Sequence, residues 1–182
     1  MRLRTLIRLW LWTTLMALAA LAVLVTIDGR LKAATGFGTA DLQKLSTAPA
    51  FNAVFGAWIA RQHAAAAGFA LGFDYLFMPL YAMSFYFSAI LLREAVAPKR
   101  GARRRLIDYL GFVPLIGALA DATENALEYS MLAGGADNST AYTAFIASNV
   151  KWSCAYVGLA LLAGGIVGVV KLRMPKKEEQ SD

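Results

Sequence analysis

Residues 106–132 read LIDYLGFVPLIGALADATENALEYSML, and this stretch indicates the fold class. A helix that crosses the roughly 30 Å hydrocarbon core of a bilayer needs about 20 mostly apolar residues, and this run is long enough. Its polar positions Asp121, Glu124, Asn125 and Glu128 are spaced i, i+3, i+4 and i+7, so a helix places them all on one face. Ionisable side chains are costly in lipid, so we expect that face to point into a bundle of membrane helices.

The composition of the whole chain agrees with a membrane protein. Of 182 residues, 58% are hydrophobic and 16% charged, and the mean hydropathy is +0.51. Soluble domains have about half apolar and about a quarter charged residues. One cysteine, Cys154, and one histidine, His63, are too few for an intramolecular disulfide, a cysteine cluster or a multi-histidine metal or haem site. The sequence therefore predicts no metal site, and it names no cofactor.

Three further apolar runs have the length of a membrane span, at residues 6–27, 66–92 and 140–170. We predict an all-α, polytopic membrane protein in which residues 1–172 form a single four-transmembrane-helix bundle. Residues 173–182 are predicted to be a disordered cytoplasmic tail. The first run resembles a secretory signal, because Arg2 and Arg4 precede it and Arg8 lies in its first turn. It exceeds a signal's apolar core of about 7–15 residues, so we expect a retained anchor.

The lysines and arginines predict the orientation. Thirteen of the 18 lie in the N-terminal segment, in residues 93–105 or in the C-terminal tail, four lie in residues 28–65, and Lys151 lies inside a span. By the positive-inside rule both termini are cytoplasmic and residues 28–65 form an external loop. The net charge of +6 reflects this topology and does not indicate nucleic acid as a partner. The basic residues 99–105 are an orientation signal, with binding of anionic lipid head groups as the alternative.

The predicted external loop contains one apolar stripe with helical spacing. Its members are Phe51, Val54, Phe55, Trp58 and Ile59. Thr47 can cap the start of such a helix, and proline at position 49 is tolerated in a first turn. We expect an amphipathic helix that lies on the outer membrane face or covers the bundle, and that roofs part of any pocket there.

Charged residues on three of the predicted spans lie at a similar depth. At 1.5 Å per residue, Asp74 and Glu124 lie about 12 Å, and Asp121 and Lys151 about 17 Å, from the outer ends of their predicted helices. Lys151 shares its face with a row of small residues, so we expect it to point into the bundle. Asn149 falls on a different face. The sequence thus predicts one polar cluster in the outer half of the membrane.

The charges of this cluster do not balance, because four carboxyl groups accompany one lysine. Either some carboxyl groups carry a proton, or a cation, a second subunit or a cationic ligand completes the cluster. In a structural interpretation, Asp121 or Glu124 pairs with Lys151 and the amides and tyrosines join helices, although such bonds average only ~0.6 kcal/mol. In a functional interpretation, the residues line a pocket that opens outward. The candidate pocket residues are Asp74, Tyr75, Tyr81, Asp121, Glu124, Asn125, Glu128 and Lys151.

Part of the chain resembles a group of small bacterial membrane proteins with four spans and no known activity. The resemblance is carried by Phe73-Asp74-Tyr75, Pro79-Leu80-Tyr81, the DxxEN sequence Asp121-Ala122-Thr123-Glu124-Asn125 and the lysine of the last span, and it covers residues 58–162. It implies a bacterial inner (plasma) membrane protein in which the acidic residues, the amide and the lysine act as a unit. It implies no reaction.

Two classes of function remain open. The first is a pocket protein that binds or acts on a lipid or a small polar or amine-bearing molecule, with Tyr75, Tyr81 or Trp152 as an aromatic wall. Whether it is an enzyme stays open, and the absence of a glycine-rich phosphate loop disfavours phosphoryl transfer from a nucleotide. The second is an accessory or assembly subunit of a larger membrane complex. Membrane lipids, a homodimer or such a complex are the partners considered, because four spans without an internal repeat are few for an independent transporter.

Overall fold

The computed structural model describes residues 2–97 and 101–173, and every regular element in these residues is helical. The elements are α1 (Leu3–Thr35), the short 3-10 helix η1 (Thr39–Lys44), α2 (Ala48–Ala60), α3 (Ala64–Val96), α4 (Ala102–Gly134) and α5 (Asn138–Arg173). The four long helices are long and apolar enough to cross a membrane, so the chain is an integral membrane protein with an all-α four-helix bundle. The predicted fold class is confirmed. Beyond Arg173, the predicted tail lies outside the described residues, as do Lys99 and Arg100.

The four long helices are longer than the apolar runs that predict them. Each has 33 or 36 residues, or about 50 Å, which exceeds the ~30 Å hydrocarbon core by about 20 Å. α1 in particular continues past the predicted end at residue 27, because Leu31 is buried in the core at that end of the bundle. Residues 28–65 are therefore not a simple loop, since they contain the last turns of α1, η1 and α2.

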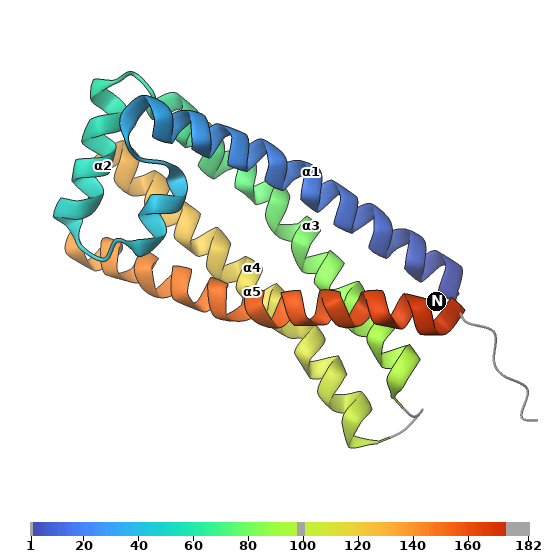
Figure 1. Cartoon of the computed structure of the whole chain (residues 1–182). Helices are drawn as coiled ribbons and strands as arrows, with labels where there is room; N and C mark the ends of the chain where they lie inside the picture. Colours follow the sequence, from blue (N-terminus) through green and yellow to red (C-terminus); the bar gives the residue numbers. More distant parts are fainter. Residues whose placement is uncertain (1, 98–100, 174–182) are drawn as a thin grey trace, which may run out of the picture.

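The bundle is built around α3, which packs against α1, α4 and α5. Figure 1 shows η1 and α2 at one end, here called the capped end, whereas α1 begins and α5 ends at the opposite end, here called the terminal end. At the terminal end, Leu6, Ile7 and Trp10 of α1 pack with Val169 and Leu172 of α5. From there α1 and α5 diverge toward the capped end, so that they form a V over α3 (Figure 1).

The predicted amphipathic helix is α2, and it closes the capped end. Its buried stripe, Phe51, Val54, Phe55 and Trp58, packs on residues from all four long helices: Leu31, Ala67, Met131, Ala141 and Ala144. Ile59 was expected on this stripe but is 57% exposed, because the stripe needs no fifth member once Trp58 fills the core. Thr47 precedes the first turn, but its side chain makes no capping hydrogen bond. α2 therefore covers the bundle core and does not lie free on the membrane surface.

A tight connection joins α4 to α5 and ties α2 to both. Asp137 caps α5, because its Oδ1 accepts hydrogen bonds from the amides of Thr140 (3.0 Å) and Ser139 (2.9 Å). Hydrogen bonds from the Thr140 hydroxyl and amide hold the pKa of Asp137 below its usual range. The next residue, Asn138, accepts a hydrogen bond of 2.9 Å from the amide of Ala48 at the start of α2. The cap of α5 and the position of α2 are thus fixed together.

Glycines in α5 bring its backbone against α3. A Cβ atom built on Gly165 would lie 2.8 Å from the Cα of Ser88, and one on Gly168 would lie 2.8 Å from the carbonyl oxygen of Leu91. Both distances are too short for a real contact, so only glycine allows this approach. In lipid the hydrophobic effect does not drive helices together. Close contacts between small residues therefore contribute to helix association there.

Replacing Gly165 with Ala should therefore push α3 and α5 apart. We expect Gly165→Ala to lower the free energy of unfolding by about 1–3 kcal/mol, the usual cost of overpacking. Gly72→Ala is the matched control, because a Cβ at this helical glycine meets nothing within 4 Å. It should be neutral or slightly stabilising. Denaturation in detergent measures both, and equal stability of the two variants would contradict the close contact.

Candidate functional site

Lys151 of α5 lies between two acidic side chains of α4. Its Nζ is 2.6 Å from Oε2 of Glu124 and 3.1 Å from Oδ1 of Asp121. All three residues are buried, with at most 8% of their surface exposed. The two acids are three residues apart, nearly one turn, so the ammonium group can bridge them. The prediction that Lys151 points into the bundle is confirmed, and it pairs with both of its candidate partners.

Polar contacts join α3 to the same cluster. The Asn125 amide nitrogen donates a hydrogen bond of 2.8 Å to Oδ2 of Asp74, and the Tyr81 hydroxyl donates one of 3.2 Å to Oδ2 of Asp121. The same Asn125 nitrogen also lies 3.3 Å from the carbonyl oxygen of Leu71. Residues of α3, α4 and α5 therefore meet at one level, as the depths along the sequence indicate.

Glu128 is the acidic residue with the fewest partners. Its side chain is only 3% exposed, yet no hydrogen bond or ion pair to it occurs within residues 2–97 and 101–173. A buried polar group without a partner costs free energy, and an unpaired charge costs more. We call Asp74, Asp121, Glu124 and Glu128 the acid cluster. Among the described residues, only Asp121 and Glu124 of this cluster pair with the ammonium group of Lys151.

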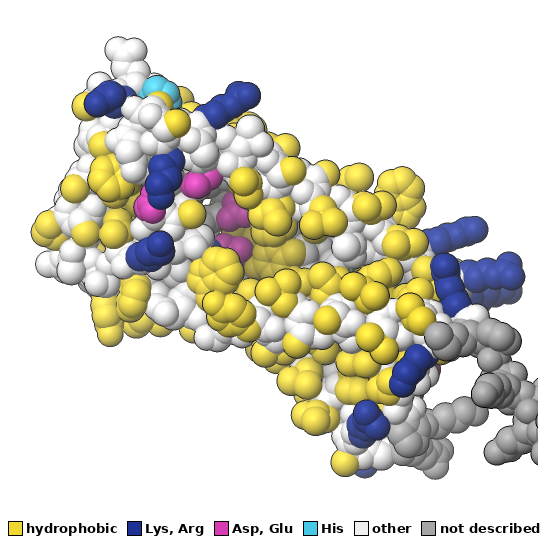
Figure 2. Space-filling view, in the orientation of Figure 1, with side chains coloured by type: hydrophobic (Ala, Val, Ile, Leu, Met, Phe, Trp, Pro, Cys, Tyr) yellow, Lys and Arg dark blue, Asp and Glu magenta, His cyan; other side chains and the backbone are white. Residues whose placement is uncertain are grey.

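Asp74, Asp121 and Glu128 of the acid cluster border a cavity of about 430 Å³ in the space between α1 and α5, here called the α1–α5 cavity. Its polar end is formed by Asp74, Asp121, Asn125, Glu128 and Lys151. Its other walls are mostly apolar: Leu18, Leu21 and Val25 of α1, Phe77 and Phe85 of α3, and Leu159 and Leu162 of α5. Figure 2 shows this hollow from outside, with acidic side chains visible at its floor near the capped end.

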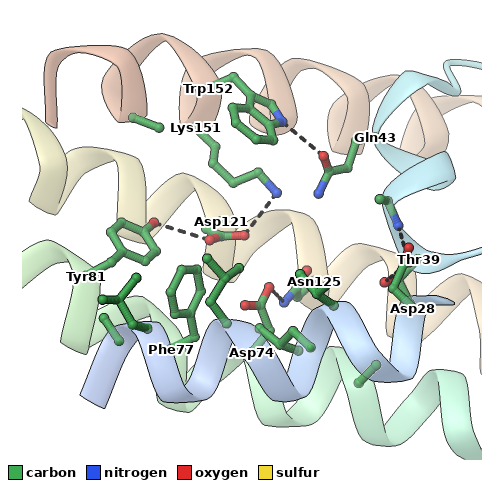
Figure 3. A pocket seen from close by; sticks show the side chains of 18 of the residues that line it. Asp28, Thr39, Gln43, Asp74, Phe77, Tyr81, Asp121, Asn125, Lys151 and Trp152 are labelled. Atoms are coloured by element: carbon green, nitrogen blue, oxygen red, sulfur yellow. Dashed lines mark hydrogen bonds and ion pairs between the residues drawn. The ribbon is translucent and has the colours of Figure 1, made fainter. Parts of the chain in front are cut away.

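Most of the predicted pocket residues border this cavity. Asp74, Tyr81, Asp121, Asn125, Glu128 and Lys151 line it (Figure 3). Glu124 does not line the cavity, although its carboxylate binds the ammonium group of Lys151, which does. Tyr75 also lies outside the lining. It is 45% exposed, and its hydroxyl donates a hydrogen bond of 2.8 Å to the carbonyl oxygen of Ala122. The aromatic wall consists of Phe77, Tyr81 and Trp152 instead.

The capped end of the cavity is formed by Trp152 together with residues that the sequence did not single out, which are Asp28, Thr39, Ala40 and Gln43. Asp28 Oδ1 accepts hydrogen bonds from the Thr39 hydroxyl (2.9 Å) and the Ala40 amide (3.0 Å), and Trp152 Nε1 donates one of 3.0 Å to Gln43 Oε1. η1 is therefore tied to α1 on one side and to α5 on the other (Figure 3). The expectation that α2 roofs the pocket is wrong, because the apolar stripe of α2 is used in the core. No periodic signal marks these long-range contacts.

The opposite end of the cavity contains hydroxyl groups that bond to one another. The Thr14 and Ser84 hydroxyls are 2.6 Å apart, and both residues line the cavity. One turn further along α3, Ser88 accepts a hydrogen bond of 2.8 Å from Trp10 Nε1. These polar groups join α1 to α3 and already have hydrogen-bond partners. The acid cluster is therefore the more favourable place for a charged group of a ligand.

The chemistry available at the site is that of carboxylates, an amide, an ammonium group and aromatic rings. Within residues 2–97 and 101–173, no group of three or more His, Cys, Asp or Glu side chains is arranged to hold a metal ion. No protein-family model matches the sequence, and searches of curated proteins and of solved structures also gave no match. The geometry of the cavity therefore carries the functional argument.

Lys151 should be needed to keep the two acids of α4 buried. Lys151→Met leaves them without their counter-charge, and we expect it to lower the free energy of unfolding by about 3–5 kcal/mol. Combining it with Glu124→Gln or Asp121→Asn should recover much of that loss, more with Glu124 because its contact is shorter. Thermal unfolding in detergent gives both double-mutant cycles.

Lys32→Met is the matched control for this cycle. Lys32 pairs with Asp41 near the surface, where the two side chains are 56% and 25% exposed, so its loss should cost at most about 1 kcal/mol. A lack of coupling between Lys151 and either acid would show that the ion pairs do not stabilise the bundle.

Proposed function

We propose that this membrane protein binds a protonated amine at the acid cluster of the α1–α5 cavity. The observation that carries the proposal is the Glu128 carboxyl group, which is buried, lines the cavity and has no partner among the described residues. A primary ammonium group supplies one positive charge and three N–H donors. It would partner Glu128 and offset the excess of carboxylates around Lys151.

The other lining residues support a cationic ligand over an anionic one. Among the described residues, Lys151 is the only basic one that lines the cavity, and its ammonium group is already held by Asp121 and Glu124. An anion would therefore meet carboxylates and no free cation. Phe77, Tyr81 and Trp152 add aromatic rings, whose faces attract cations. The amine could belong to a lipid head group or to a small soluble molecule, since both present the same ammonium chemistry.

We also propose that the chain is located in a bacterial inner membrane with both termini in the cytoplasm. Lys and Arg side chains gather at the two ends of the bundle and are sparse between them (Figure 2). Most of the basic residues that the structure describes belong to the terminal end, which favours that end as cytoplasmic. The capped end, and with it the acid cluster, is then nearer the outer face of the membrane.

Cysteine labelling tests this orientation. Lys44→Cys in η1 and Arg103→Cys at the start of α4 replace exposed side chains at opposite ends of the bundle. In intact cells a membrane-impermeant maleimide should label the first variant, and the second only after permeabilisation. The wild type, whose one cysteine is buried, gives the background. Labelling of Arg103→Cys in intact cells would show that the topology is the reverse of the one proposed.

Binding of dodecylammonium and of dodecanol tests the role of charge, because the two probes differ only in the head group. Wild-type protein in nanodiscs should bind dodecylammonium at least about tenfold more tightly than dodecanol, as expected for a charge-assisted contact in a buried site. Glu128→Gln should remove most of this preference and leave dodecanol binding unchanged. Native mass spectrometry and titration calorimetry provide the readouts.

Asp137→Asn is the control for overall charge, since it removes one carboxylate outside the cavity and keeps a good helix cap. It should bind both probes as the wild type does. Equal affinity of the wild type for dodecanol and dodecylammonium would overturn the proposal. A failure to bind either probe, in a protein that purifies with a second membrane protein, would favour the alternative of an accessory or assembly subunit.

A further inference from the structure

The α1–α5 cavity has an open side between the two helices that form it. α1 and α5 meet at the terminal end and diverge from there (Figure 1). Leu18 and Val25 of α1 and Leu159 of α5 line the cavity and are still 56%, 62% and 51% exposed. These side chains lie along helices that cross the membrane, so the surroundings to which they are exposed are lipid chains.

The end of the cavity that faces water is covered by η1. Thr39, Ala40 and Gln43 line the cavity there, and η1 crosses from α1 to α5 at the capped end (Figure 1). Hydrogen bonds hold it on both sides, from Thr39 to Asp28 of α1 and from Trp152 of α5 to Gln43. The direct route from water is thus obstructed, whereas the route from the membrane passes between the apolar side chains of Leu18, Val25 and Leu159.

The polarity of the cavity also matches that of a lipid in the outer leaflet. The acid cluster lies toward the capped end, and the cavity extends along α1 from Asp28 to Thr14, about 21 Å at 1.5 Å per residue. Asp74 is ten residues from the start of α3 at Ala64, about 15 Å, so it lies about 5 Å below the outer hydrocarbon boundary if the ~50 Å helix is centred. A head group would point outward and a tail inward, as in the leaflet itself.

We infer that the ligand is a single-chain amphiphile with an ammonium head group, which enters sideways from the outer leaflet between α1 and α5. This inference rests on the proposed function, since it adds a tail and a route to the amine site. The cavity volume of about 430 Å³ lies in the lower part of the range for sites that hold one drug-sized molecule, about 300–1,000 Å³. That volume suits one chain beside Leu21, Phe85 and Leu162, and a two-chain phospholipid would not fit as a whole.

The tail is tested by comparing hexylammonium with dodecylammonium in wild-type protein and in the double variant Leu18→Trp/Leu159→Trp, which narrows the opening from both sides. The wild type should bind dodecylammonium at least about tenfold more tightly than hexylammonium. The double variant should lose about tenfold in dodecylammonium affinity and keep its hexylammonium affinity within about twofold. Leu15→Trp/Ile166→Trp, on exposed residues of the same helices outside the cavity lining, should behave as the wild type.

The route is tested with the double variant Asp28→Cys/Thr39→Cys, in which a disulfide or a short bismaleimide links η1 to α1. The cross-linked and reduced forms of this one protein should bind dodecylammonium at equal rates if the ligand enters between the helices. A binding rate at least about tenfold lower in the cross-linked form would place the route at the water-facing end and overturn the inference.

The two proposals fail in different ways. If both ammonium probes bind with equal affinity, or if narrowing the opening weakens both equally, the tail does not lie between α1 and α5, although amine binding stands. If neither ammonium probe binds to the folded wild-type protein, the amine site itself is absent. Binding of hexylammonium alone would identify a soluble amine as the ligand.

Discussion

The buried ion pairs of Lys151 with Asp121 and Glu124 are the interaction on which the site depends. Taking three charged groups out of water is costly, and the cost is offset only when each group keeps a close partner. The contacts of 2.6 and 3.1 Å fix α5 against α4, and Tyr81 and Asn125 extend the same network to α3. Because these groups are held in place, Glu128 is left facing the cavity without a partner among the residues that the structure describes.

The geometry that creates the cavity comes from two opposite kinds of packing. Glycines of α5 allow its backbone to touch α3, so that these helices and α4 form a tight core. α1 packs on α3, and near the terminal end its residues Leu6, Ile7 and Trp10 also pack with residues of α5. The space that opens between α1 and α5 is bordered by the polar cluster on one side and by apolar side chains on the other, which gives the cavity its amphipathic character.

Several features could be predicted from the sequence, and for a common reason. Spans of about 20 apolar residues, the polar face of residues 121–128 and the inward direction of Lys151 all follow from local rules of length and helical periodicity. The stripe of α2 follows from the same rule, apart from Ile59. By contrast, neither the end of α1 at Thr35 nor the exclusion of Tyr75 from the cavity has a local signal. Both depend on which neighbouring helix each residue meets.

By itself, the sequence determined that this protein is a bundle of four membrane helices with acids, an amide and a lysine at one depth, because insertion into a bilayer depends on hydrophobic length and on the cost of each charge. The tertiary structure alone decided that Asp28, Thr39 and Gln43 join the site, and that η1 covers the cavity in place of α2. Those contacts connect residues far apart in the chain. The divergence of α1 from α5, which leaves the cavity open, results from how whole helices pack, a property that no short stretch of sequence contains.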